Sequence, residues 1–215
     1  MKRWALLTVA LYVVFLSILA FPMLLLLREK DNPADYIAFF YGWIAPILIL
    51  IQVVLLLVPL AVVQERPVKR RKIIVSAVIG GIPMTVMTLS FIGFILLMIL
   101  GENDAWDFRG WMVLAAFAIS WLIWGILFWK NFSSKDPGSY TSTMTRWLLR
   151  GSILELIVAV PSHIISRRRD ECCAPPITLF GIVTGLSIAG LSFGPGVFFL
   201  FAKRIKDKRG RAPTA

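Results

Sequence analysis

One acidic residue lies inside a long apolar stretch of the sequence. Glu155 stands within the run LELIVAV, where a charged carboxylate would cost several kcal/mol if the run crossed a membrane. Ionisable residues in such positions usually mark a transport path or a paired site. Two interpretations stay open: a site that binds a proton or cation, and a protonated or ion-paired glutamate that fixes helix packing.

Glu155 shares one helical face with small residues, most of them polar. The members of this face recur at intervals of three or four positions: Ser152, Glu155, Ala159, Ser162 and Ser166. His163, the only histidine, lies at its edge. We expect the face to contact protein or water rather than lipid. The candidate polar intramembrane site consists of Glu155, Ser152, Ser162 and His163.

A histidine and two adjacent cysteines form a second candidate site. His163, Cys172 and Cys173 carry imidazole and thiol groups, which bind Cu or Zn, and adjacent thiols suit a soft ion such as Cu(I) or Hg(II). Their spacing matches none of the structural zinc patterns. In the alternative interpretations the cysteines do thiol redox work, form a vicinal disulfide, or pack as small hydrophobic residues. No cofactor other than a soft metal ion is predicted.

Three consecutive arginines follow the same apolar run. Arg167, Arg168 and Arg169 present guanidinium groups, which form bidentate contacts with phosphate, so they are candidates for contact with lipid headgroups or an anionic substrate. The alternative is a solvated turn whose charges are offset by Asp170 and Glu171.

Small residues recur along one face of the last apolar run. They are Gly181, Gly185, Ala189, Ser192 and Gly196. Small side chains at this spacing let two membrane helices approach closely. We expect close packing against the polar face around Glu155, or against another subunit of a homo-oligomer or a membrane partner.

The composition indicates a membrane protein. The chain has 215 residues, and its 58% hydrophobic content exceeds what a soluble core of that size could bury. The net charge of +11 comes from Lys and Arg in short clusters between apolar runs, a pattern that sets membrane orientation. The basicity therefore does not indicate a nucleic-acid partner, and the expected partner is the lipid bilayer.

Six apolar runs are long enough to cross a bilayer as helices. They cover residues of about 4–27, 37–63, 73–100, 111–129, 147–166 and 177–202. The connections between them are short and polar, so residues 1–215 are predicted to form a single transmembrane domain. The sequence predicts an all-α polytopic integral membrane protein, a bundle of about six transmembrane helices.

The distribution of charge predicts the orientation. If the N-terminus is inside, only six of the 23 Lys and Arg residues fall on the outer side, and most acidic residues lie there. Because basic residues are retained on the cytoplasmic side, we expect both termini inside a bacterial cytoplasmic (inner) membrane. The arginines at 167–169 are the discordant outer cluster.

The motifs of several enzyme classes are missing. The sequence has no Walker lysine loop, no GxSxG, no HExxH and no second histidine. It favours a small non-enzymatic membrane protein for transport, sensing or an accessory role, with an outward-facing polar site where the fifth and sixth runs meet. Two alternatives remain. One is a membrane enzyme, either a thiol oxidoreductase using the cysteines or a lipid-modifying enzyme. The other is soft-metal binding or transport.

Overall fold

The computed structural model describes residues 2–27, 33–63, 70–101, 110–133, 137–169 and 174–210. Within these ranges every residue is helical except Leu19, Gly101 and Arg169, which confirms the predicted all-α class. The helices, in chain order, are α1 (Lys2–Ile18), α2 (Ala20–Leu27), α3 (Pro33–Phe39), the π-helical turn η1 (Phe40–Ile44), α4 (Ala45–Val63), α5 (Arg70–Leu100), α7 (Gly110–Ser133), α8 (Pro137–Arg168) and α9 (Ala174–Gly210).

Six helical stretches in the described chain are long and apolar enough to cross a membrane, as expected. They are Arg3–Leu24, Ala34–Leu60, Ile74–Leu100, Gly110–Lys130, Ser142–Arg168 and Pro175–Phe198. Two helices extend well past the apolar runs: α8 begins at Pro137 rather than near residue 147, and α9 continues to Gly210 rather than ending near residue 202. Proline suits a first helical position, and the tail is rich in Lys and Arg, which are good helix formers. Hydropathy marks where a helix is apolar, and not where it ends.

Two prolines explain the irregular turns near the start of the chain. Pro22 cannot donate a hydrogen bond to the carbonyl four residues before it, and the helix is interrupted at Leu19 between α1 and α2. Pro46 follows η1, where the Ala45 N–H bonds to the Phe40 carbonyl across a wider turn. Pro59, Pro83, Pro161 and Pro195 remain inside regular helices.

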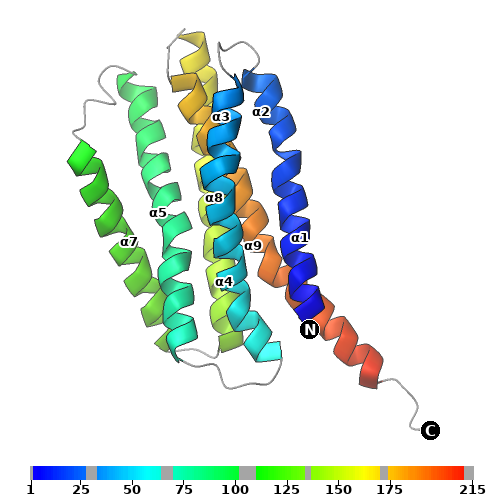
Figure 1. The fold of residues 1–215 in the computed structure, drawn as a ribbon. Helices are drawn as coiled ribbons and strands as arrows, with labels where there is room; N and C mark the ends of the chain where they lie inside the picture. The colour runs from blue at the N-terminus through cyan, green and yellow to red at the C-terminus, as the bar shows by residue number, and fades with distance from the viewer. Residues whose placement is uncertain are drawn as a thin grey trace.

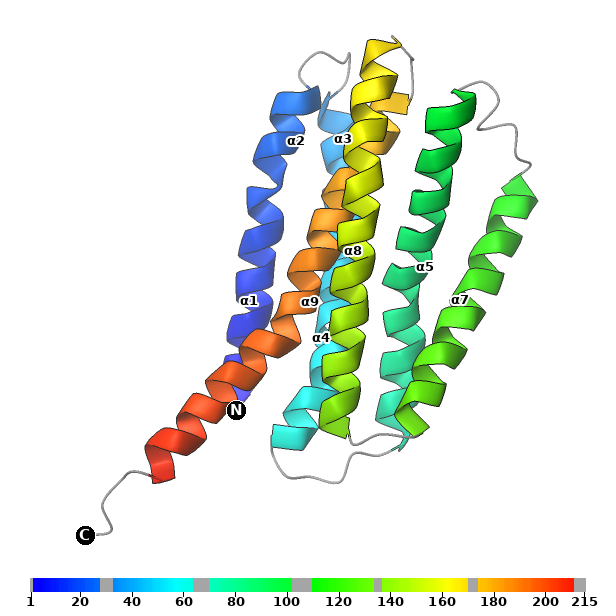
Figure 2. The same cartoon turned by 180° about the vertical axis from the view of Figure 1, so that it is seen from behind.

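The six membrane-length segments form a bundle in which α9 is central and α7 is peripheral (Figure 1). α9 packs against α1, α4, α5 and α8, and about half of the residues in its membrane-length segment are buried. α7 packs chiefly against α5, and within its membrane-length segment only Phe128 is buried. Seen from behind, α7 again stands at the edge of the bundle (Figure 2). The core therefore forms around α8 and α9.

The helical region that opens the chain and the far end of α9 lie at the same end of the bundle (Figure 1). A chain that crosses a membrane an even number of times returns to the side on which it began, so six crossings would give this arrangement. It agrees with the predicted placement of both termini on one side, while the side itself stays a prediction.

Candidate functional site

The face of α8 that carries Glu155 is directed into the bundle. Ser152, Glu155 and Ala159 have no exposed surface, and Ser162 and Ser166 are 1% exposed. α8 packs mainly against α9 and α5, so these two helices supply most of the surroundings of this face. The small side chains on either side of Glu155 allow the neighbouring helices to approach closely.

Glu155 lies near the middle of the Ser142–Arg168 segment. Ser90 of α5 lies near its carboxyl group. Neither Oε1 nor Oε2, however, has a hydrogen-bond partner of good geometry among the described residues. Buried polar atoms are nearly always paired, because leaving one unpaired costs about 1–3 kcal/mol. A carboxyl group with two such oxygens therefore requires an explanation beyond packing.

A glycine on α9 makes room for this carboxyl group. A Cβ atom at Gly185 would lie 3.3 Å from Oε2 of Glu155 and 3.2 Å from Cδ2 of Leu156. Any larger side chain at this position would press on the carboxyl group. The structure thus brings together Glu155 and one of the small residues that the sequence singled out on the last helix.

His163 connects the C-terminal part of α8 to the beginning of α9. Its Nδ1 lies 3.1 Å from the Pro175 carbonyl oxygen and 2.9 Å from Thr178 Oγ1. The Thr178 hydroxyl itself donates to the Pro175 carbonyl at 3.0 Å. Because a carbonyl oxygen only accepts, we assign the proton of the neutral ring to Nδ1. Nε2, which is buried without a partner among the described residues, then carries the lone pair.

The serines of the face differ in what their hydroxyls do. Ser152 donates to the Leu149 carbonyl at 2.9 Å, and Ser166 donates to the His163 carbonyl at 3.1 Å. The Ser162 hydroxyl is buried with no partner in the described part of the chain. Ser162 is seven residues from Glu155, about 10 Å along a helix. The four predicted site residues therefore form a row along α8 rather than one cluster.

The predicted metal or redox site cannot be described as a group. Cys172 and Cys173 lie outside the described residues. Among the residues that are described, no three His, Cys, Asp or Glu side chains come together as metal ligands would. The contact of His163 with Pro175 brings the histidine to the chain segment just after the cysteines. The soft-metal site thus stays a prediction.

The three arginines at the end of α8 are exposed. Arg169 donates from Nη2 to the Met98 carbonyl oxygen at 3.1 Å, and so contacts the last turn of α5. α5 ends there at Leu100 and is followed by Gly101, whose φ of 81° only glycine adopts readily. One arginine of the predicted lipid-contact cluster therefore stabilises a helix end, a role that sequence spacing did not indicate.

Glycines of α9 contact different neighbours on its two sides. A side chain at Gly181 would collide with Phe94 of α5, and Gly185 faces α8. On the other side, Gly190 faces Phe15 of α1, and Gly194 faces Gln52 of α4. Gly196 borders open space, with no atom within 4 Å of a Cβ placed there. Of the predicted small-residue face, Gly181 and Gly185 therefore pack against other helices of this chain, whereas Gly196 does not.

Two further buried polar residues were missed at the sequence level. Gln52 of α4 and Thr85 of α5 have no exposed surface, and Gln52 Oε1, Gln52 Nε2 and Thr85 Oγ1 lack partners in the described chain. Gln52 fills the space beside Gly194. The signal was present in the sequence, because a lone glutamine in the run ILILIQVVLLL is as anomalous as Glu155.

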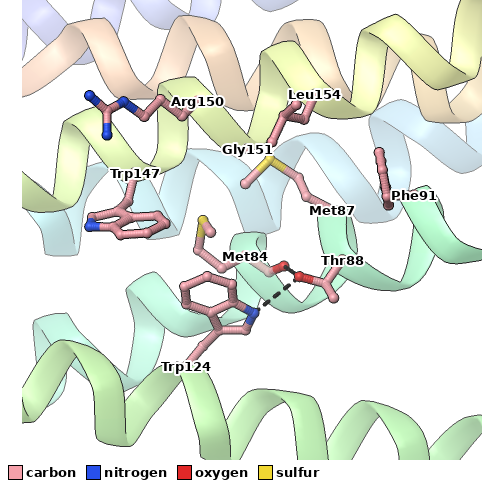
Figure 3. A pocket seen from close by; sticks show the side chains of 9 residues that line it. All are labelled: Met84, Met87, Thr88, Phe91, Trp124, Trp147, Arg150, Gly151 and Leu154. Carbon is pink, nitrogen blue, oxygen red and sulfur yellow. Dashed lines mark hydrogen bonds between the residues drawn. The ribbon is translucent and has the colours of Figure 1, made fainter.

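A small cavity between α5, α7 and α8 lies on another side of α8 (Figure 3). Its volume is about 170 Å³. The Trp124 indole N–H donates to Thr88 Oγ1 at 3.1 Å, and Thr88 donates to the Met84 carbonyl at 2.8 Å. The Arg150 guanidinium points away from the methionine sulfurs (Figure 3). Because the Trp124 and Thr88 donors are already used within the protein, this cavity is a weaker candidate than the surroundings of Glu155.

No protein-family model matches the chain, and neither a curated protein nor a solved structure is similar to it by the comparisons made. Its function is therefore inferred from the geometry of its own residues.

Proposed function

We propose that this chain is a non-enzymatic, multi-pass protein of a bacterial cytoplasmic membrane that binds a proton or a small cation at Glu155, as a carrier does during transport. The observation that carries the proposal is the fully buried carboxyl group whose two oxygens lack partners among the described residues. Binding sites of transporters lie near the middle of the membrane, and Glu155 is near the middle of its segment.

The membrane setting is supported by the outer surface of the bundle. Large apolar side chains are exposed on helices far apart in the sequence, among them Leu6 (75%), Ile99 (71%) and Leu114 (73%). Water would make such a surface aggregate, whereas lipid solvates it. Apolar side chains on the outer surface, with the few ionisable and polar side chains directed into the bundle, are the pattern that a bilayer favours.

A proton or cation would relieve the main energetic defect of the site. A charged carboxylate in this position has no compensating donor of good geometry, and its Ser90 neighbour offers one hydroxyl. Protonation removes the charge, and a bound cation neutralises it. Ser162 and His163 leave further polar atoms unpartnered toward the far end of α8, and they mark the route that we propose toward the outer side.

The protonation of Glu155 can be followed by infrared difference spectroscopy on the protein in lipid nanodiscs. We expect a pH-dependent carboxylic C=O band in the parent that is missing in Glu155→Gln and retained in Asp35→Asn, whose carboxyl group is exposed near the end of another segment. In proteoliposomes, an imposed pH gradient should drive proton uptake in the parent and not in Glu155→Gln. Identical spectra and fluxes in the parent and Glu155→Gln would refute the proposed function.

Orientation is tested separately. A reporter that is active only in the periplasm should be active when fused after Arg109 and silent when fused at Ala215. An active fusion at Ala215 would contradict the proposed topology without bearing on whether Glu155 binds a proton.

Soft-metal binding is the second candidate, favoured by the unpartnered lone pair on Nε2 of His163. Asparagine places an amide N–H near the position of Nδ1 but has nothing at Nε2. His163→Asn should therefore keep the contact with Pro175 and lose Hg(II) or Cu(I) binding, measured by protection of Cys172 and Cys173 from a maleimide. Equal protection in both proteins would remove His163 from the metal site.

A further inference from the structure

An apolar groove runs between α5, α7 and α9. Its volume is about 520 Å³, which lies within the roughly 300–1,000 Å³ typical of sites for drug-sized ligands. Phe94 and Phe180 contribute aromatic rings, and the polar side chains of its lining are Ser90 and Thr184. No residue that lines the groove is charged. The groove alone would accept any apolar molecule.

The carboxyl group of Glu155 lies behind one end of this groove. Ser90 lines the groove and lies near the carboxyl group from the α5 side. Thr184 lines it from the α9 side and precedes Gly185, whose Cβ position is 3.3 Å from Oε2 of Glu155. The same two turns of α5 and α9 therefore border both the groove and the unpartnered carboxyl group.

Charge near this end of the groove has one sign. The apolar interiors of α4, α5, α7 and α9 contain no Asp, Glu, Lys, Arg or His, because their charged residues stand at the helix ends. On α8 itself, the neighbours of Glu155 in sequence that carry ionisable groups are Arg150, which is exposed, and His163, which is tied to Pro175. Glu155 is thus the acidic group available to a ligand from the groove.

We propose that the groove binds a lipophilic cation, an amphiphilic ammonium or phosphonium with an aromatic or aliphatic body, whose charge pairs with the Glu155 carboxylate. This inference rests on the proposed function and names its substrate class. The apolar body fills the groove against the aromatic side chains of Phe94 and Phe180, and the carboxylate neutralises the cation. When Glu155 is protonated beforehand, binding releases one proton to water, so the cation and the proton compete for one site. An acyl chain would leave the carboxyl group unpartnered.

Binding of tetraphenylphosphonium to the full chain in nanodiscs tests whether the charge of the ligand pairs with Glu155. We expect saturable binding that strengthens as pH rises, release of one proton per ligand, and at least about tenfold weaker binding to Glu155→Gln. Glu155→Asp, which keeps the charge, should retain pH-dependent binding. Unchanged affinity in Glu155→Gln would show that only apolar contact holds the ligand and would overturn the proposal.

Substitutions in the groove test whether the ligand binds there. A Cβ atom at Gly93 meets no atom within 4 Å, so Gly93→Leu should fill the groove without disturbing the bundle. Gly125→Leu is the matched control, because Gly125 is equally unobstructed but lines a different cavity, beside Trp121 and Ile126. We expect tetraphenylphosphonium binding to be lost in the first variant and kept in the second. Ala116→Phe, on the α7 side, replaces Gly93→Leu if that protein does not fold.

The outcomes separate the two proposals. If Glu155 shows its carboxylic infrared band and proton flux but tetraphenylphosphonium does not bind, or binds equally to Gly93→Leu, the groove proposal fails and the proposed function stands. If the band and the flux are missing in the parent, the proposed function itself fails. A phospholipid that co-purifies with the parent and is not displaced by tetraphenylphosphonium would assign the groove to lipid.

Discussion

The centre and the edge of this bundle are built from different residues. α9 contacts four helices through glycines, and polar groups of α8 and α4 fill the spaces beside Gly185 and Gly194. α7 is held to α5 by tryptophans, with Trp121 Nε1 donating to the Val78 carbonyl at 2.8 Å. A helix surrounded by neighbours needs small residues at each contact. A helix at the edge of the bundle packs against its neighbours through one face only. Substitutions should therefore have opposite consequences in the two regions.

The largest expected effect comes from adding a methyl group to glycines in the two regions. Gly181→Ala places a Cβ against the Phe94 ring and should lower the free energy of unfolding by about 1–3 kcal/mol. Gly125→Ala meets no atom within 4 Å and should stabilise α7 by up to about 1 kcal/mol through helix propensity. Equilibrium unfolding in mixed micelles measures the change in the free energy of unfolding for both variants. Equal effects would mean that α9 is no more tightly packed than α7.

A smaller effect of opposite sign is expected at the buried carboxyl group. Glu155→Leu removes two unpartnered oxygens and should raise the free energy of unfolding by about 1 kcal/mol, while proton uptake is abolished. Leu154→Ala, an exposed position on the same helix, serves as the control and should leave proton uptake unchanged. A destabilised Glu155→Leu protein would show that the carboxyl group holds the bundle together.

The smallest effect is expected at the edge. Trp121→Phe removes the indole donor to the Val78 carbonyl and should cost about 0.5 kcal/mol, because the bond is exposed. Trp129→Phe, on an exposed part of the same helix, should be close to neutral. Hydrogen exchange in nanodiscs should then detect faster opening of α7 in Trp121→Phe, with α8 and α9 unaffected. Faster exchange throughout the bundle would show that α7 is not a separate edge element.

The sequence predicted the helical class and the number of membrane-length helices because apolar length is a strong signal. It also drew attention to Glu155, since one charge among aliphatic residues is conspicuous. It could not predict the Arg169 contact with Met98, which joins residues far apart in the chain. It also could not show that Ser90 of α5 lies near Glu155, because the rotation of one helix against another depends on how all the side chains fit together.

The bond between Arg169 and the end of α5 bears on how the groove can open. It fastens the last turn of α5 to α8, so this wall of the groove is anchored at its far end. α7 is fastened differently: Trp121 and Trp124 make their bonds to α5 near the middle of α7, and the groove lies beside Met112 to Ala116, closer to the N-terminal end of α7. Both tryptophan bonds thus lie away from the groove, and we expect a molecule that enters the groove to displace the wall formed by α7 more easily than the anchored end of α5.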